Sequence, residues 1–256
     1  MSKGGRGMDE QLMQKAVASA HEALQHAAIH EQKGLPASAS TILTIEMVKI
    51  NAALKHFRKP GMGEDSRAGS RHLDLALQQC RQKESTCRAA ARRQMQTYGL
   101  LYKQGHFVKS WQTRLFILSG GQVKYYVPGD VESKGTLMLH QIKSVQAVAM
   151  RNNGFKIETA TKVYFCQAPD DMSLQAWTAA LRPLKVGFLM KQGAQVRSWK
   201  KRWCMLWRTQ LAYFETHTET KERKGFVLLR EVVPESVQAV PKATFGHENI
   251  FQVQTG

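Results

Sequence analysis

The sequence predicts a multi-domain protein in which an α-helical region over residues 1–96 is followed by two small β-barrels. Each barrel is expected to have seven strands and a C-terminal helix. The first barrel is expected over residues 97–184, and the second, which is truncated, over residues 185–256. Two observations predict this order: helical spacing of apolar residues in the first third of the chain, and an internal repeat across the remainder.

The first third of the chain has the apolar spacing of amphipathic helices. One helix is expected over residues 10–33, ending at Gly34 and Pro36. A second is expected to begin with Ser40 as its N-cap and to run to about Phe57. After the turn-rich segment 59–66, a third and strongly polar helix is expected over residues 70–95. The apolar positions that predict the first helix are Leu12, Ala16, Ala20, Leu24 and Ala27.

The remainder of the chain contains a duplicated segment. Residues 98–105 return as residues 186–193, so that Gly105 corresponds to Gly193 at an offset of 88 residues. Further along, Phe155 corresponds to Phe251 at an offset of 96 residues. An offset that grows only between matching blocks is typical of a duplicated domain with small loop insertions. We refer to residues 97–184 as the first copy and to residues 185–256 as the second copy.

Each copy has the pattern of short antiparallel strands. In the first copy, strands at residues 115–118 and 123–127 flank a glycine-containing hairpin turn at 119–122. Further strands are expected at 136–139, 144–149, 154–159 and 163–166. Residues 170–181 then predict a helix, because four apolar residues recur on one face. These residues are Leu174, Trp177, Ala180 and Leu181.

The spacing of basic and aromatic residues, which recurs in both copies, resembles that of the pleckstrin-homology (PH) family. In the first copy the resemblance is carried by Lys103, Gly105, Trp111, Arg114, Phe116, Leu118, Tyr125, Tyr126, Lys134, Gly135 and Trp177. In the second copy it is carried by Lys191, Gly193, Trp199, Lys200, Arg202, Trp203, Leu206, Tyr213, Phe214, Lys224 and Gly225. The second copy lacks counterparts of the last two strands and of the closing helix. We therefore expect the sequence to be a fragment, or the domain to be completed by residues not present in it.

The resemblance implies a phosphoinositide site between the first two strands of each copy. An arginine offers a planar fork for phosphate, a lysine a compact positive charge, and a tyrosine a hydroxyl donor. In the first copy the expected site residues are Lys103, Lys109, Arg114 and Tyr125, with His106 as a further loop contact. In the second copy they are Lys191, Lys200, Arg202 and Tyr213. Gln112 stands in the first copy where the second has Lys200, so the second site has the fuller set of charges.

The helical region weakly resembles a microtubule-interacting-and-trafficking (MIT) three-helix bundle, which implies protein partners; a self-associating helical extension is the alternative. Its five histidines are expected on helix surfaces, and no metal or other cofactor is expected. The four cysteines form no CxxC pair and are expected to be reduced cytosolic thiols. No apolar run approaches the roughly 18 residues that span a bilayer.

The net charge of +17 favours an anionic partner. No P-loop, GxSxG or HExxH motif is present, so we expect no enzymatic activity. The predicted function is a phosphoinositide-binding adaptor in signalling that tandem PH domains recruit to a membrane. It is expected in the cytoplasm, peripherally on the plasma membrane or endosomes. The alternative is a scaffold whose barrels bind proteins without specific lipid recognition; nucleic-acid binding is not expected, because a reader motif is missing.

Overall fold

The computed structural model describes residues 3–59, 64–193, 196–217, 222–246 and 248–255. The chain divides into two compact units. The first unit contains residues 1–93 together with the segment 126–133, and the second contains residues 94–125 and 134–256. The predicted fold class is confirmed, because a three-helix region precedes two PH-like sheets and the second sheet is truncated.

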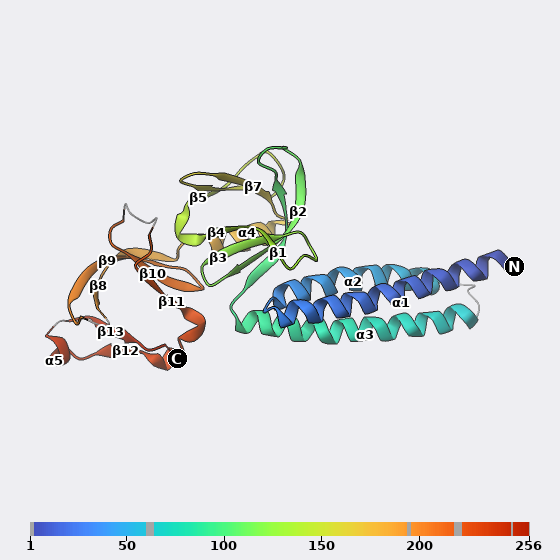
Figure 1. The fold of residues 1–256 in the computed structure, drawn as a ribbon, viewed down its shortest axis with the longest axis horizontal. Helices are drawn as coiled ribbons and strands as arrows, with labels where there is room; N and C mark the ends of the chain where they lie inside the picture. The colour runs from blue at the N-terminus through green and yellow to red at the C-terminus, as the bar shows by residue number, and fades with distance from the viewer. Residues whose placement is uncertain (1–2, 60–63, 194–195, 218–221, 247, 256) are drawn as a thin grey trace. The chain divides into compact units, whose positions relative to one another are not determined.

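Three long helices make up most of the first unit (Figure 1). They are α1 (Lys3–Gln32), α2 (Pro36–Phe57) and α3 (Glu64–Arg93). Each helix packs against the other two. The core between them is rich in alanine, which allows helix axes to approach closely, and is filled out by a few larger side chains. Its buried residues are Ala20, Ala27, Ala39, Leu43, Ile50, Leu54, Phe57, Leu73, Ala76, Leu77, Cys80 and Cys87.

The turn between α1 and α2 uses the two residues that the sequence pattern singles out. Gly34 has a φ of +71°, a left-handed conformation that favours glycine. The Leu35 amide donates to the carbonyl of His30 at 2.8 Å, which satisfies a free carbonyl at the end of α1. Pro36 then begins α2, where its fixed φ is already helical and its missing amide hydrogen costs nothing.

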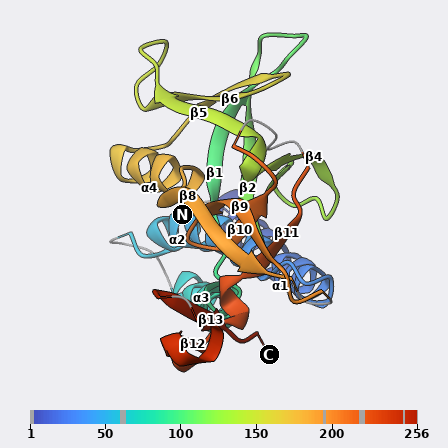
Figure 2. The same ribbon diagram turned by 90° about the vertical axis from the view of Figure 1, so that its left-hand side faces the viewer.

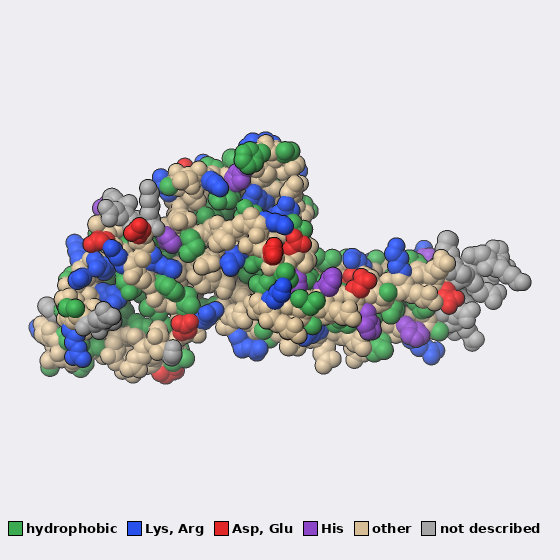
Figure 3. Space-filling model, in the orientation of Figure 1, with side chains coloured by type: hydrophobic (Ala, Val, Ile, Leu, Met, Phe, Trp, Pro, Cys, Tyr) green, Lys and Arg blue, Asp and Glu red, His purple; other side chains and the backbone are tan. Residues whose placement is uncertain are grey.

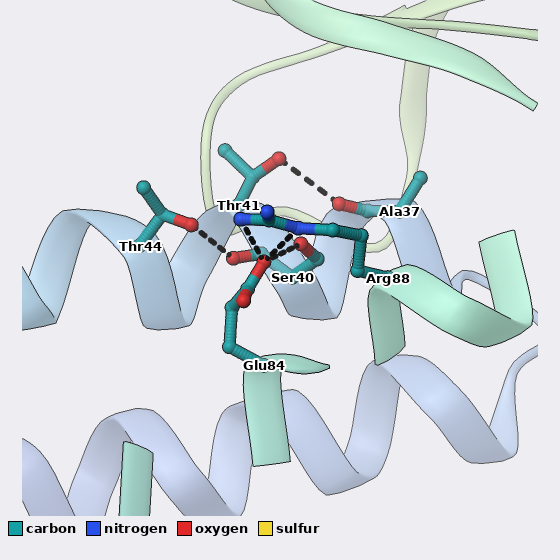
Figure 4. A network of polar contacts seen from close by, with 6 residues as sticks. All are labelled: Ala37, Ser40, Thr41, Thr44, Glu84 and Arg88. Carbon is teal, nitrogen blue, oxygen red and sulfur yellow. Dashed lines mark hydrogen bonds and ion pairs between the residues drawn. The ribbon is translucent and has the colours of Figure 1, made fainter. Parts of the chain in front are cut away.

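The prediction that Ser40 caps the second helix was wrong. Because Pro36 starts α2 one turn earlier, Ser40 lies inside the helix and is 1% exposed. Its hydroxyl donates to Glu84 Oε1 of α3 at 2.7 Å, and Arg88 of α3 donates to the same oxygen through Nε at 2.8 Å (Figure 4). A buried carboxylate needs such partners, because burial removes its hydration. The two helices are therefore joined by a buried polar contact.

The expectation that all helix histidines lie on the surface was also wrong for one of them. His30 is 2% exposed, and its Nε2 lies 3.0 Å from the carbonyl oxygen of Gly129 in the segment 126–133 of the same unit. Burial lowers the pKa of His30, so the neutral ring is favoured. The described residues contain no group of three or more potential metal-ligating side chains.

The first copy folds as one seven-stranded sheet with the order β4-β3-β2-β1-β7-β6-β5. Its strands are β1 (Thr97–Gln104), β2 (Trp111–Ser119), β3 (Gln122–Tyr126), β4 (Ser133–Met138), β5 (Ile142–Ala147), β6 (Gly154–Thr159) and β7 (Val163–Gln167), with a 3-10 turn at Leu139–Gln141. Helix α4 (Asp171–Leu181) lies beside β5 (Figure 2). Trp177 of α4 is 3% exposed and meets Phe116 edge-to-face with ring centroids 6.0 Å apart, as expected for a helix that closes the core.

The second copy repeats the first four strands of this sheet, in the order β11-β10-β9-β8. They are β8 (Lys185–Gln192), β9 (Trp199–Leu206), β10 (Gln210–Phe214) and β11 (Gly225–Leu228). A separate hairpin consists of β12 (Val237–Val240) and β13 (Ile250–Val253), with two 3-10 turns before it and the short α5 (Lys242–Phe245) within it. This hairpin repeats the β5–β6 pair, since Val237 lies opposite Val253 as Val145 lies opposite Ile157. The prediction that the last two strands of the second copy are missing was therefore wrong for one of them, since only β7 has no counterpart among the described strands. Without a counterpart of β7 beside β8 in the described sheet, Leu189 is 39% exposed, whereas its counterpart Leu101 is 1% exposed.

Buried residues of the second copy belong to the same apolar cluster as the core of the first copy. Trp207, Ala212 and Phe214 are the fully buried members from the second copy. The ring of Phe214 lies 5.7 Å from that of His140, between centroids. Across the described residues, no helix combines the length and the apolar character needed to cross a membrane.

Replacing Glu84 by alanine is expected to destabilise the helical unit by about 1–3 kcal/mol, because the Ser40 hydroxyl and the Arg88 guanidinium lose their buried acceptor. Hydrogen exchange of peptides from α2 and α3 would measure this loss. Asp74→Ala is the control: it removes an equally direct ion pair to Arg58, but one with both side chains largely exposed. This control is expected to cost less than about 1 kcal/mol. Equal protection in the two variants would contradict a structural role for the Glu84 contact.

Candidate functional site

The pairing of the first two strands in each copy places the predicted basic residues on one face. In the first copy Lys103 pairs with Gln112, and Leu101 pairs with Arg114. Directly paired residues of an antiparallel sheet point to the same side, as do residues two apart in one strand. Lys103, Gln112 and Arg114 therefore share a face. The second copy has the same register, with Lys191 opposite Lys200 and Leu189 opposite Arg202.

The loop that joins these two strands is closed in the same way in both copies. The Gly105 amide donates to the carbonyl of Ser110 at 2.9 Å, and the Gly193 amide donates to that of Ser198 at 3.0 Å. A β-carbon on Gly105 would overlap the carbonyl oxygen of Val108, so any other residue would force the loop open. This closure keeps the strand ends, and the basic residues on them, in a constant position.

Lys103 is more buried than a typical lysine, at 7% exposed. Its Nζ lies 5.1 Å from the centroid of the Tyr125 ring and 5.8 Å from that of Tyr164, and it donates to the Gln104 carbonyl at 3.2 Å. Burial lowers the pKa of Lys103, and the charges of Arg114 and Lys162 lower it further. The ammonium is thus held between two aromatic rings beside other cations.

Arg114 and Tyr125 complete the centre of the first site. Arg114 donates through Nη1 to the Thr113 carbonyl at 2.8 Å and through Nη2 to Gln112 Oε1. None of these acceptors is charged, so the guanidinium stays available for an anion. The ring of Tyr125 stacks on Phe116 with centroids 5.5 Å apart. Burial raises the pKa of Tyr125, which keeps its hydroxyl protonated and able to donate.

Three further cationic or polar side chains surround this centre. The His106 ring meets the Tyr164 ring edge-to-face with centroids 5.3 Å apart. Burial lowers the pKa of His106, and the charges of Lys103, Lys162 and Lys109 lower it further. Lys109 is exposed on the loop, as predicted, and Lys162 is exposed in the turn between β6 and β7. The first site therefore gathers cations from two loops and two strands.

The second site has the same centre but contains an acidic residue. Lys191 Nζ lies 4.9 Å from the centroid of the Tyr213 ring and donates to the Gln192 carbonyl at 3.0 Å. Glu215 forms an ion pair of 2.9 Å with Lys224. This ion pair lowers the pKa of Glu215, and the charges of Arg202 and Lys200 lower it further. Glu215 therefore lies within the field of the basic motif, where the first copy has Val127.

Glycine makes room for the tyrosine of each site. A β-carbon on Gly135 at the start of β4 would overlap the hydroxyl of Tyr125, and one on Gly225 of β11 would overlap the hydroxyl of Tyr213. Each tyrosine therefore lies across a strand that has no side chain at that position. This arrangement explains the pairing of a glycine with a tyrosine in both copies.

The structure brings Lys103, Arg114 and Tyr125 together, and it repeats this arrangement with Lys191, Arg202 and Tyr213. Lys109 and Lys200 are exposed at the edges of these groups. Three further residues of the two sites, Tyr164, Lys162 and Glu215, were not predicted from the sequence. The one sequence feature that pointed to Lys162 is its place in the turn between the last two strands of the first copy. For Glu215 the feature is the acidic residue that stands where the first copy has Val127.

Comparison with known proteins agrees with this fold. The model of the PH domain family matches residues 95–186 and, separately, residues 183–256. These matches cover more than half of the chain, and the chain therefore belongs to the PH domain family.

Individual relatives are similar over shorter segments. The RAC family serine/threonine-protein kinase homolog of Dictyostelium discoideum is 33% identical over 87 residues, which cover 32% of this chain and 19% of that protein. Pleckstrin homology domain-containing family A member 2 of Homo sapiens is 27% identical over 137 residues, which cover 49% of this chain and 32% of that protein. The chain thus spans less than a third of either relative.

Among solved structures, the C-terminal PH domain of pleckstrin is 35% identical to this chain. The match covers 33% of this chain and 90% of that chain, with a TM-score of 0.31. The same domain has been solved in complex with an inositol pentakisphosphate, and that structure has a TM-score of 0.30.

Gly135→Ala is expected to displace the Tyr125 hydroxyl and to lower the melting temperature of the first copy, because the new methyl group occupies the place of that hydroxyl. Side-chain NMR of Tyr125 and a thermal melt would measure both effects. Gly187→Ala is the control, since a β-carbon there meets no atom within 4 Å. An unchanged Tyr125 resonance in the Gly135 variant would contradict the proposed packing.

Proposed function

We propose that the chain is a phosphoinositide-binding adaptor that its two PH domains recruit to anionic membranes. The observation that carries this proposal is the cationic face formed by Lys103 and Arg114 and repeated by Lys191 and Arg202. Buried or crowded cations without an acidic partner are costly, and a phosphorylated headgroup would relieve that cost. The proposed domain limits are 97–184 and 185–256.

The first site is suited to a headgroup with more than one phosphate. Burial lowers the pKa of His106, and the charges of Lys103 and Lys162 lower it further, so the charged form of this ring is disfavoured. An anion placed among them would reverse this effect and favour the charged forms. Arg114 would supply a bidentate contact, and the protonated Tyr125 hydroxyl would supply a neutral donor.

The two sites differ in electrostatic balance. Lys200 adds a cation to the second site, whereas Gln112 stands at that position in the first. The ion pair of Glu215 with Lys224 offsets this gain. Figure 3 shows Lys and Arg side chains over the β8–β10 sheet with acidic groups among them. We infer that the first copy is the stronger anion binder despite its shorter basic motif.

Two sites on one chain would act together on a membrane. Each basic residue near an anionic surface contributes about 1 kcal/mol of attraction, and linkage turns the second binding event into an intramolecular one. We further propose that the chain itself performs no catalysis and works peripherally on a cytoplasmic membrane surface. Protein partners of the helical unit, which the MIT resemblance implies, belong to the same proposal.

A protein scaffold is the second candidate function, and one observation favours it. Val186, Phe188 and Met190, which alternate along β8, are 51%, 44% and 56% exposed. Exposed apolar side chains on one face of a strand are typical of protein contacts. A stable complex with a partner protein, together with no binding to phosphoinositide vesicles, would favour this function over the first.

The double variant Arg114→Ala with Arg202→Ala is expected to lose binding to vesicles that contain a phosphorylated inositol lipid. A hydrogen bond to a charged group contributes about 1.5–3 kcal/mol, so each replacement is expected to weaken binding at least about tenfold. Vesicle co-sedimentation would measure this loss. The control, Arg81→Ala with Lys185→Ala, removes the same total charge from exposed positions outside the two sites. Equal binding by both double variants would reject the proposed sites.

Glu215→Gln is expected to strengthen vesicle binding a few-fold, and more at low salt, because it removes the negative charge beside Arg202. The same substitution in an Arg202→Ala background is expected to have a smaller effect, which a double-mutant cycle would measure. Glu235→Gln changes the charge equally at another exposed position and serves as the control. If Glu215→Gln and Glu235→Gln strengthened binding equally, only the net charge would matter.

A further inference from the structure

One face of the second-copy sheet is buried at β10 and exposed at β8. Phe188 of β8 lies opposite Trp203 of β9, and Trp203 lies opposite Phe214 of β10, so the three side chains form one row. We call the face that carries this row the outer face. Phe214 is 0% exposed, whereas Phe188 is 44% exposed on β8, the edge strand of the described sheet (Figure 1). Burial therefore decreases along the row towards that edge.

The first copy covers the β10 side of the outer face. Gln210 and Ala212 alternate with Phe214 along β10, and all three are 0% exposed. Ala212 and Phe214 belong to the apolar cluster shared with the first copy, and a β-carbon on Gly121 of the β2–β3 turn would overlap the Gln210 side chain. At β9, Trp203 is only partly buried against the same cluster. The apolar surface thus continues beyond the contact between the two copies.

The uncovered part of the outer face is apolar and held in one arrangement. Val186, Phe188 and Met190 alternate along β8 and are exposed. The Phe188 ring meets the Trp203 ring edge-to-face with centroids 5.0 Å apart, and the His217 ring lies 6.1 Å and 6.0 Å from those two rings. We call these five residues the outer-face patch. Clustered apolar side chains on an ordered surface mark an interaction site.

Lys201 determines the charge that suits a partner of this patch. It pairs with Met190 and therefore lies on the outer face, where its Nζ is 4.5 Å from the centroid of the Phe188 ring. None of the ion pairs among the described residues includes Lys201. A partner that covers the ring with apolar side chains and offers a carboxylate to the ammonium is therefore complementary to the patch.

The dimensions of the uncovered strip fit one helix. The strip consists of β8 and part of β9, so it is about 5–10 Å wide, close to the diameter of about 10 Å of an α-helix. From Val186 to Met190 the strand rises about 13 Å, and eight residues of a helix rise about 12 Å. Apolar residues at i, i+4 and i+8 of an amphipathic helix therefore each meet one residue of the β8 row.

We propose that the outer-face patch docks an acidic amphipathic helix of a partner protein, with its apolar residues on the β8 row and a carboxylate on Lys201. This inference deepens the scaffold function by naming the chemistry of the partner, and it does not depend on lipid binding. Lys191 and Arg202 of the second headgroup site lie on the opposite face, because Leu189 rather than Phe188 pairs with Arg202. One sheet thus has separate faces for a membrane and for a protein.

Two designed peptides test this proposal by fluorescence anisotropy. The acidic probe is a labelled helical peptide with leucine at i, i+4 and i+8 and glutamate at the flanking positions; the basic probe has lysine for each glutamate. Phe188→Ser is expected to weaken binding of the acidic probe about tenfold, because the ring loses its apolar cover. The control is Phe251→Ser on the β12–β13 hairpin, where the ring is 49% exposed. Equal binding by the two variants would overturn the proposal.

A charge reversal tests the role of Lys201. Lys201→Glu is expected to weaken binding of the acidic probe and to strengthen binding of the basic probe, so that the preference between them is reversed. Arg208→Glu changes the net charge equally at an exposed position between β9 and β10 and is expected to retain the acidic preference. If both variants shifted the preference equally, net charge alone would explain binding and the helix site would be rejected.

Measurements on the Phe188→Ser variant exclude two other occupants. It is expected to bind phosphoinositide vesicles as the unmodified chain does and to sediment as the same species. Weakened vesicle binding would assign the patch to a bilayer, and conversion of a dimer to a monomer would assign it to a second copy of the chain; either result would overturn the proposal. The Arg114→Ala, Arg202→Ala variant is expected to keep binding the acidic probe, so failure of the lipid function would leave this inference intact.

Discussion

Each site depends on the register of one hairpin, β1–β2 in the first copy and β8–β9 in the second. This register places Lys103 and Arg114 on one face of the sheet and repeats that placement with Lys191 and Arg202. A shift of one residue would turn one of the two cations to the opposite face, because side chains alternate along a strand. The hydrogen bonds that the Gly105 and Gly193 amides donate close the loop in each copy. In the first copy the buried Leu101, which lies opposite Arg114, also holds the register from the core.

The two sites have the same strand register but differ in the balance of positive and negative side chains. In the first copy, cations affect one another without an intervening carboxylate: Lys103 lies between two tyrosines, and His106 lies among three lysines. In the second copy, Glu215 pairs with Lys224 and reduces the effective charge of a longer basic motif. The number of basic residues favours the second site, whereas the proposed ranking from charge balance favours the first.

Much of the fold could be predicted from the sequence, because strand alternation, hairpin turns and the Trp177 helix all leave local patterns, and the repeat doubles each signal. The resemblance to the PH family implied that Lys103 and Arg114 would lie close together across the first hairpin. Contacts made by distant segments left no such pattern. Lys162 reaches the site through a turn between later strands, and Ser40 binds Glu84 across two helices instead of capping its own. The burial of Lys103 depends on Tyr164, which the motif does not include.

The identical closure of the two loops has a consequence for how such a protein changes over generations. Because Gly105 and Gly193 each bond to a serine five residues later, the residues between them can vary without moving the strands. The loop tip is therefore a part of the chain where point substitutions are expected to cost little folding stability, because the hydrogen bond at the base of the loop is unaffected.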